Sequence, residues 1–212
     1  LYVGNDRGVW VSIDAGAHWT RLHANLPAVA VHDLLIHPRE SDLVLGTYGR
    51  ALWSGDVSFL PEVTPEVLGR SAYLFDIEPK ARYGFGQQGM TYELYGARFL
   101  SVPNEPEAIV INYYVKADQA AGAKITVTDA KGRVMRQLDG PAKAGMNRVL
   151  WFLAGTRPRG GGGGGGEGGS AGTPPVAPSP NIQATVGEYT ITVEVAGEKL
   201  TKPARVRERI GG

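Results

Sequence analysis

Because the chain has no cysteine, any chemistry must use oxygen or imidazole groups, and the carboxylates of the first 60 residues are the first candidates. Hydrolysis of a glycosidic bond needs two carboxyl groups roughly 5 to 10 Å apart, on either side of the scissile bond. Asp14 and Asp56 each follow a serine by two positions, which favours a structural role in a repeated turn. Asp33 lies next to His32 in an apolar run, where it either faces a channel or makes a hydrogen bond at a strand end. The remaining candidates are Asp6, Glu40 and Asp42.

Histidine and serine show no catalytic or metal-binding pattern. The histidines occur without His-x-x-x-His or His-Glu-x-x-His spacing, so no metal site is expected. Ser12 and Ser54 are not in a Gly-x-Ser-x-Gly elbow, and no triad is predicted. The glycine run 160–166 is not a phosphate-binding loop, because no Lys and Ser/Thr follow it. The sequence therefore predicts no catalytic residue, metal or cofactor in this segment. The histidines are His18, His23, His32 and His37.

The eight residues from Ser12 to Trp19 have the composition of a tight hairpin corner: Ser-Ile-Asp-Ala-Gly-Ala-His-Trp. The carboxylate of Asp14 can accept hydrogen bonds from the backbone N–H groups of the following turn. Gly16 can adopt a positive φ without a Cβ clash, and Trp19 can place a large apolar ring beneath the turn. We therefore expect these four residues to act together in shaping a turn.

Positions 1–14 and 43–56 form a repeat with a shift of 42 residues, in which Val3 matches Leu45 and Val9 matches Ala51. The second copy keeps the serine and the aspartate, as Ser54 and Asp56, but loses the glycine and has Pro61 where the tryptophan would be. Short β runs at such a period are typical of propeller blades. The first blade would enter at its second strand, and the second would stop after its third. The expected strands are 1–3, 9–13, 19–22, 31–36, 43–45 and 51–53.

The motif Ser-x-Asp-x-Gly-x-x-Trp is similar to the Asp-box (BNR repeat) found in the blades of sialidases, sortilins and xyloglucanase-type glycoside hydrolases. Residues 31–38 and 45–53 resemble the final blade of large bacterial sortilin-like proteins, often labelled glycosyl hydrolase by similarity. In that family a connector and a small sandwich, similar to the Ig-like module of flagellar hook-capping proteins, follow the propeller. The resemblance implies a structural Asp-box at Ser12, Asp14, Gly16 and Trp19, and a degenerate one at Ser54 and Asp56.

Composition and charge change near the turn-forming run 102–106. Residues 107–212 carry 14 basic and 9 acidic side chains, whereas residues 1–60 carry 4 and 6. The expected architecture is all-β: the last, incomplete propeller blades at 1–60, a connector at 61–106 and an Ig-like antiparallel β-sandwich at 107–212. Thr64 and Pro65 suit the start of a helix. Recurring aromatics pack the connector onto its neighbours or, alternatively, form a sugar-stacking row: Tyr73, Phe75, Tyr83, Phe85, Tyr92, Tyr95 and Phe99.

Alternating apolar and polar residues at 109–116 and 187–195 predict strands with one apolar face each. Glycines mark hairpin turns at Gly132 and Gly197. Residues 155–181, rich in glycine and proline, have almost nothing to bury and are expected to form a disordered loop inside the sandwich. The basic residues of 199–209 are interpreted as the protection of an edge strand, with contact to an anionic polymer as the alternative. Further strands are expected at 125–128, 133–138, 147–153 and 200–207.

Charge and hydropathy limit the partners. With 22 basic and 21 acidic side chains, the net charge of +1 is too balanced for a dedicated nucleic-acid binder. No apolar run approaches the roughly 20 residues that span a bilayer. We expect a fragment whose nearest partners are upstream blades of the same protein, with a polysaccharide or a protein as further partner. The resemblance implies an extracytoplasmic location, periplasmic or secreted.

Three functional hypotheses follow. The leading one is a non-catalytic C-terminal segment of a secreted Asp-box propeller protein, with a binding or structural role. The alternative is part of a glycoside hydrolase, xyloglucanase-type or sialidase-like, whose catalytic carboxylates lie mostly upstream. In the third, the sandwich docks a partner through an edge strand, so that residues 107–212 would bind by themselves.

Overall fold

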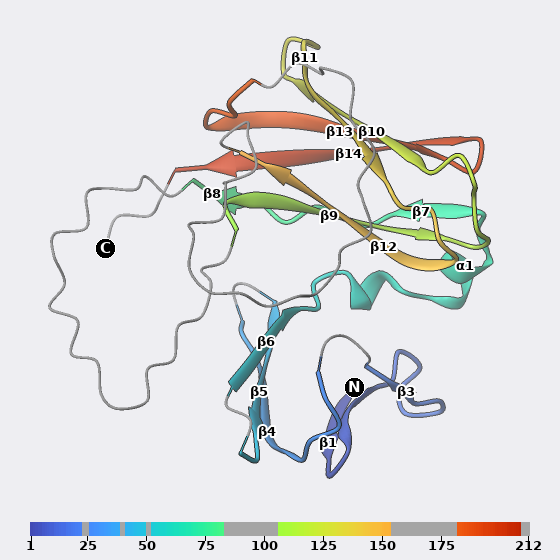
Figure 1. Ribbon diagram of the computed structural model, residues 1–212, viewed down its shortest axis with the longest axis vertical. Coiled ribbons are helices and arrows are strands. Elements are labelled where there is room, and N and C mark those ends of the chain that lie inside the picture. The colour runs from blue at the N-terminus through green and yellow to red at the C-terminus, as the bar shows by residue number, and fades with distance from the viewer. Residues whose placement is uncertain (23–25, 39–40, 50–51, 83–105, 154–181, 209–212) are drawn as a thin grey trace, which may run out of the picture. The chain divides into compact units, whose positions relative to one another are not determined.

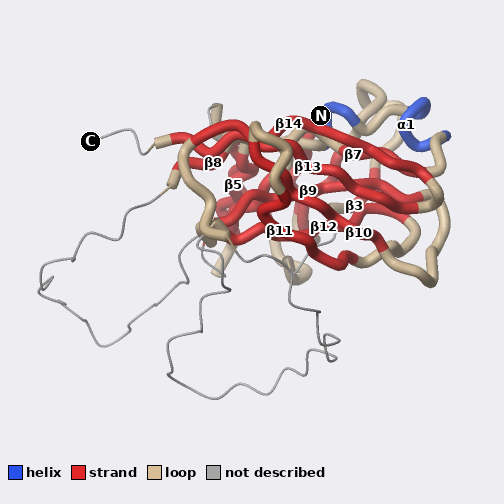
Figure 2. Tube along the Cα trace, turned by 90° about the horizontal axis from the view of Figure 1, so that it is seen from above, coloured by secondary structure: helices blue, strands red, loops and turns tan. Residues whose placement is uncertain are grey.

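The computed structural model describes residues 1–22, 26–38, 41–49, 52–82, 106–153 and 182–208. The chain divides into two compact units, Leu1–Arg70 and Ser71–Gly212. Strands make up nearly all of the regular structure in both units (Figure 2), so the predicted all-β class is confirmed. In the part of the chain just defined, no helix is long and apolar enough to cross a membrane. The predicted loop at 155–181 and the connector aromatics from Tyr83 onward lie outside the described residues.

The first unit contains two antiparallel sheets of three strands, each with its strands in chain order (Figure 1). The strand runs predicted for residues 1–60 are all found, with bounds that differ by a few residues. The first sheet consists of β1 (Tyr2–Asn5), β2 (Gly8–Val11) and β3 (Thr20–Arg21). The second consists of β4 (Val31–Ile36), β5 (Asp42–Thr47) and β6 (Leu52–Asp56).

Two short helices follow these sheets, η1 (Leu60–Glu62) and α1 (Pro65–Gly69). The predicted helix start is confirmed, because Thr64 Oγ1 accepts a hydrogen bond from the backbone N–H of Val67 at 3.3 Å and Pro65 is the first helical residue. A proline loses nothing in that position, since the first N–H groups of a helix have no partner within it.

The two sheets of the first unit pack through β1 and β4 and share one hydrophobic cluster. Gly4 of β1 permits this approach, because a Cβ at that position would lie 2.9 Å from Cγ1 of Val31 in β4. The buried members of the cluster are Val9, Val31, Leu43, Leu45 and Val57, against which Tyr2, Leu22, Leu26, Leu34, Trp53 and Leu60 pack.

The repeat in the sequence and the repeat in the structure differ by one residue in the second strand of each hairpin. In the first sheet Val9 stands opposite Gly4, and in the second Leu52 stands opposite Gly46. The match of Val9 with Ala51 is therefore wrong, because the connection from β5 to β6 is one residue longer than that from β1 to β2. By the same register, Trp10 and Trp53 occupy equivalent positions.

The second unit contains a five-stranded sheet in the order β11-β10-β13-β14-β8 and a three-stranded sheet in the order β12-β9-β7. All pairs are antiparallel except that of β14 with β8, which is parallel. The strands are β7 (Ala72–Leu74), β8 (Lys80–Ala81), β9 (Ala108–Val115), β10 (Ala123–Asp129), β11 (Val134–Gly140), β12 (Gly145–Phe152), β13 (Gly187–Val195) and β14 (Glu198–Arg207).

Buried side chains from both sheets of this unit belong to one hydrophobic cluster, so the sheets form two layers around a common core. Trp151 of β12 is 1% exposed and lies edge-on to the ring of Tyr189 in β13, with centroids 5.0 Å apart. The hairpins predicted at Gly132 and Gly197 are confirmed as the β10–β11 and β13–β14 connections.

The units divide after Arg70, whereas the sequence predicts a connector over 61–106. The difference arises because β7 pairs with β9 and β8 pairs with β14, so two pieces of the expected connector belong to the sheets of the second unit. The interpretation of residues 199–209 as an edge strand needs a correction at its end only: among the described residues, β8 pairs with β14 at Val206 and Arg207, and the part of β14 before them lies at the edge of the sheet.

Candidate functional site

The connection from β2 to β3 is a tight turn organised by the buried hydroxyl of Ser12. Ser12 Oγ donates a hydrogen bond to Asp14 Oδ1 at 2.8 Å and accepts one from the backbone N–H of Gly16, also at 2.8 Å. Ala15 and Gly16 both have positive φ, 58° and 99°, in the region that favours glycine. The serine thus bonds both to the carboxylate and to the backbone of the turn, a role that sequence reasoning had assigned to the aspartate alone.

The carboxylate of Asp14 is engaged through both oxygens. Oδ1 also accepts a hydrogen bond from the backbone N–H of His18 at 2.9 Å, and Oδ2 lies 2.6 Å from His18 Nδ1. The backbone N–H of His18, followed by its ring and the hydroxyl of Ser12, lowers the pKa of Asp14 to about 2. A general acid needs a pKa near the working pH. Asp14 is therefore suited to stapling the turn and unsuited to donating a proton near neutrality.

Trp19 lies beside this turn but is not enclosed. A Cβ added to Gly16 would lie 3.9 Å from Cζ2 of Trp19 and 3.6 Å from Cδ1 of Leu1, so the indole ring borders the glycine. The side chain nevertheless remains 38% exposed. Only part of its apolar surface is buried by the turn.

The second copy of the motif is arranged differently. Ser54 Oγ donates to Asp42 Oδ2 at 3.4 Å, and Asp56 Oδ1 accepts hydrogen bonds from the backbone N–H and the hydroxyl of Ser58, at 2.9 and 2.6 Å. Asp56 is the last residue of β6, so its carboxylate serves the turn that directly follows the strand. Ser58 stands at the position equivalent to Gly16 in the sequence repeat, and unlike Gly16 it does not have a positive φ.

The other carboxylate candidates are distributed over the first unit. Asp42 and Asp56 stand directly opposite each other across β5 and β6, so the structure brings these two together. Asp33 of β4 stands opposite Gly46 of β5 and is exposed. Glu40 lies outside the described residues. His32 stacks on Tyr48, with ring centroids 5.5 Å apart. Among the residues with defined positions, no three His, Asp or Glu side chains are grouped so as to hold a metal ion.

In the second unit, two tyrosine hydroxyls make hydrogen bonds that sequence reasoning missed. Tyr189 donates to the carbonyl of Thr185 at 2.8 Å and accepts from its N–H at 2.9 Å. Tyr113 donates to the carbonyl of Pro141, and burial raises the pKa of Tyr113 to about 12. The position of Tyr189, two residues after the glycine that begins β13, is the local signal that could have indicated the first of these bonds.

The basic residues of β14 lie among acidic partners. Lys199 Nζ lies 3.7 Å from Glu194 Oε1 across the β13–β14 hairpin, and Arg205 Nε lies 3.1 Å from Glu188 Oε1. Such exposed pairs contribute little to stability, but they reduce the positive potential that an anionic polymer would meet.

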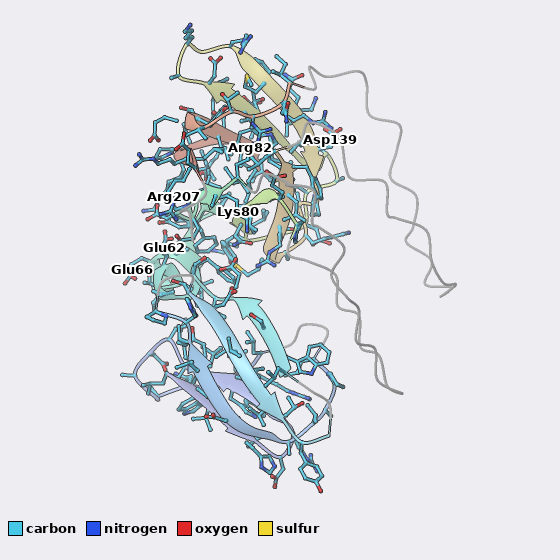
Figure 3. The ribbon with its side chains drawn as sticks, turned by 90° about the vertical axis from the view of Figure 1, so that its left-hand side faces the viewer. Glu62, Glu66, Lys80, Arg82, Asp139 and Arg207 are labelled. Carbon is cyan, nitrogen blue, oxygen red and sulfur yellow. The ribbon has the colours of Figure 1, made fainter. Side chains whose placement is uncertain are left out.

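Basic side chains also gather where β8 joins β14, as Figure 3 shows for Lys80, Arg82 and Arg207. Arg82 Nε lies 3.8 Å from Glu107 Oε1, so part of this positive charge is balanced as well.

Comparison with known proteins identifies no relative: no family model, no curated protein and no solved structure matches this chain. The resemblance to the sortilin-like family therefore stays a prediction.

Proposed function

We propose that this chain is a non-catalytic segment of a secreted Asp-box β-propeller protein, in which the first unit supplies two blades and the second an Ig-like module. Its role is structural, at the end of the propeller, and it also binds a ligand. Polysaccharide is the class of ligand to test first. The observation that carries the proposal is the turn from Ser12 to His18, where serine, aspartate and glycine are joined by hydrogen bonds and the aspartate has a lowered pKa.

The strand order of the first unit supports the blade assignment. Each sheet is an antiparallel meander, and the Asp14 turn joins the second and third strands of the first sheet. A propeller blade has four strands. On this assignment the first sheet lacks its innermost strand and the second its outermost, so β6 presents an edge that a strand from elsewhere could complete.

Three features of the second unit support the Ig-like assignment. The hydroxyl of Tyr189 is hydrogen-bonded to the backbone four residues upstream, which is the arrangement of the tyrosine corner of Ig-like sandwiches. A buried tryptophan, Trp151, packs against the same ring. The residues that belong to the core cluster occupy every second position along β9, β10 and β13, as the inward faces of two packed sheets require.

The proposal is tested by separating binding from hydrolysis. The 212-residue chain is run in affinity gels containing xyloglucan, other β-glucans or sialylated glycans, and is incubated with the same substrates in a reducing-end and sialic-acid release assay. We expect retardation by at least one polymer without release of sugar. The matched variants are Asp33→Asn, an exposed carboxylate outside the turn, and Asp14→Asn, a staple residue.

Hydrolysis that disappears in Asp33→Asn, while that variant melts at the wild-type temperature, would overturn the non-catalytic assignment. A chain that binds none of these polymers would overturn polysaccharide as the ligand class.

A further inference from the structure

One aromatic pair of the first unit faces solvent instead of contributing to the core. The ring of Tyr48 stacks on that of His32, with centroids 5.5 Å apart and an angle of 20° between the planes. Tyr48 is 75% exposed, and His32 is exposed as well. Aromatic side chains that only hold a fold together bury most of their large area. The two stacked rings, which we call the aromatic platform, leave most of theirs to solvent.

The backbone fixes the position of both rings. The register of β4 on β5 shifts between Val31 and Asp33, so His32 is the extra residue of a β-bulge. Bulges re-aim side chains and are frequent beside functional sites. Tyr48 directly follows β5, and its backbone N–H donates a hydrogen bond to the carbonyl of Ala30 at 2.9 Å. The platform is therefore held in place before any ligand arrives.

The platform lies at one end of the β4–β6 sheet rather than on one of its two faces. His32 is the second residue of β4, and Tyr48 lies one residue beyond the end of β5. The sheets of a propeller pack on one another by their faces, whereas their ends carry the connecting loops. Further blades of the proposed architecture would thus cover the faces of this sheet and leave its end accessible. Next to Tyr48, a Cβ added to Gly49 would meet no atom within 4 Å.

We propose that the aromatic platform of His32 and Tyr48 binds a pyranose unit of a neutral β-linked glucan. The face of an aromatic ring carries negative charge density, which attracts the C–H groups that project from the face of a β-glucose ring. An exposed, preorganised ring offers such a face at little cost in conformational entropy. This inference rests on the proposed function, because it names the site at which the polysaccharide is bound.

Asp33 restricts the charge of the ligand. It follows His32 directly, is exposed, and stands opposite Gly46, which has no side chain to cover it. Its carboxylate can accept hydrogen bonds from sugar hydroxyls, and it repels a carboxylate carried by the ligand. A neutral glucan is therefore favoured over a sialylated glycan at this site.

The test is affinity electrophoresis of the full 212-residue chain in gels that contain xyloglucan, hydroxyethyl cellulose or polysialic acid. Tyr48→Ala removes the exposed ring, and Tyr48→Phe keeps the ring without its hydroxyl. The matched control is Leu52→Ala, because Leu52 of β6 is a large apolar side chain that is 76% exposed in the same sheet. Circular dichroism melts establish that each variant folds.

We expect Tyr48→Ala to raise the dissociation constant for the two neutral glucans by about tenfold, as the loss of an aromatic anchor does. Tyr48→Phe and Leu52→Ala should bind as the wild type does, and polysialic acid should not retard the chain. A second measurement needs no variant: titration of the wild type with cellohexaose should shift the ring resonances of His32 and Tyr48 in NMR spectra.

The outcomes separate this inference from the proposed function. Glucan binding that Tyr48→Ala leaves unchanged, or that Leu52→Ala weakens equally, would overturn the platform as the site while polysaccharide binding stood. So would shifts by cellohexaose that spare both rings. Retardation by polysialic acid that depends on Tyr48 would overturn the neutral class of ligand. A wild type that binds none of the polymers would overturn both proposals.

Discussion

Gly140 ends β11 at a point where side chains from three other strands crowd its Cα. A Cβ added there would lie 2.5 Å from Tyr113 Oη, 2.8 Å from Val149 Cγ2 and 2.9 Å from Ile125 Cδ1. Real Cβ atoms are not found at such distances from other heavy atoms. The three neighbours belong to β9, β12 and β10, so relief requires movement on both layers of the second unit.

We expect Gly140→Ala to destabilise the second unit by about 2 to 4 kcal/mol. Overpacking of a core by one methyl group costs about 1 to 3 kcal/mol. Displacement of the Tyr113 hydroxyl would also weaken its hydrogen bond to Pro141, worth about 1 kcal/mol. The measurement is urea unfolding of the full chain, with amide exchange of β9 to β14 reporting on this unit.

A double-mutant cycle tests the geometry itself. Tyr113→Phe removes the atom closest to the new methyl group, so the double variant Gly140→Ala/Tyr113→Phe should cost less than the sum of the two single changes, by about 1 kcal/mol. The control is Gly55→Ala, because a Cβ on Gly55 meets no atom within 4 Å. A cost of Gly140→Ala no larger than that of Gly55→Ala, or strict additivity in the cycle, would refute the crowding argument.

Further expectations concern the turn at Asp14 and the hydrogen bonds of Tyr189. Asp14→Asn should lower the melting temperature of the first unit, and the difference from wild type should shrink as the pH falls from about 4 toward 2: a folded-state pKa of about 2 lies below the unfolded value, so the stabilisation is present above the unfolded pKa and lost through the folded one. A difference independent of pH would contradict this. Trp19→Ala should cost about 2 kcal/mol by urea unfolding, less than full burial would give, because the ring is 38% exposed; an unchanged transition would argue against its packing on the turn. Tyr189→Phe should cost about 1 to 2 kcal/mol and speed amide exchange at Thr185, whose N–H loses its acceptor; unaltered exchange would show that the bond is not made in solution.

The local features of this protein follow from its sequence. Alternation of apolar and polar residues over 109–116 and 187–195 predicts β9 and β13, because side chains on a strand point to opposite faces in turn. Thr64 and Pro65 predict the start of α1, since a threonine oxygen can accept the free N–H groups of a first turn. These features depend on residues within a few positions of one another.

The pairing of distant strands needed the tertiary structure. The segments that become β7 and β8 are too short to show a period, and they are strands because β9 and β14 offer them free edges. The bond between Tyr189 and Thr185 likewise requires the turn before β13 to bring the hydroxyl to the backbone.

The two copies of the repeat show the same division most clearly. Val3 and Leu45 match in sequence and in strand position, yet one is exposed and the other buried. A strand pattern defines two faces but not which of them a neighbour covers, because burial depends on what packs there. The extra residue between β5 and β6 also moves Leu52 to the position of Val9, a change of register that pairing alone reveals. The sequence thus determined the strands and turns, and the tertiary structure decided their partners and their exposed faces.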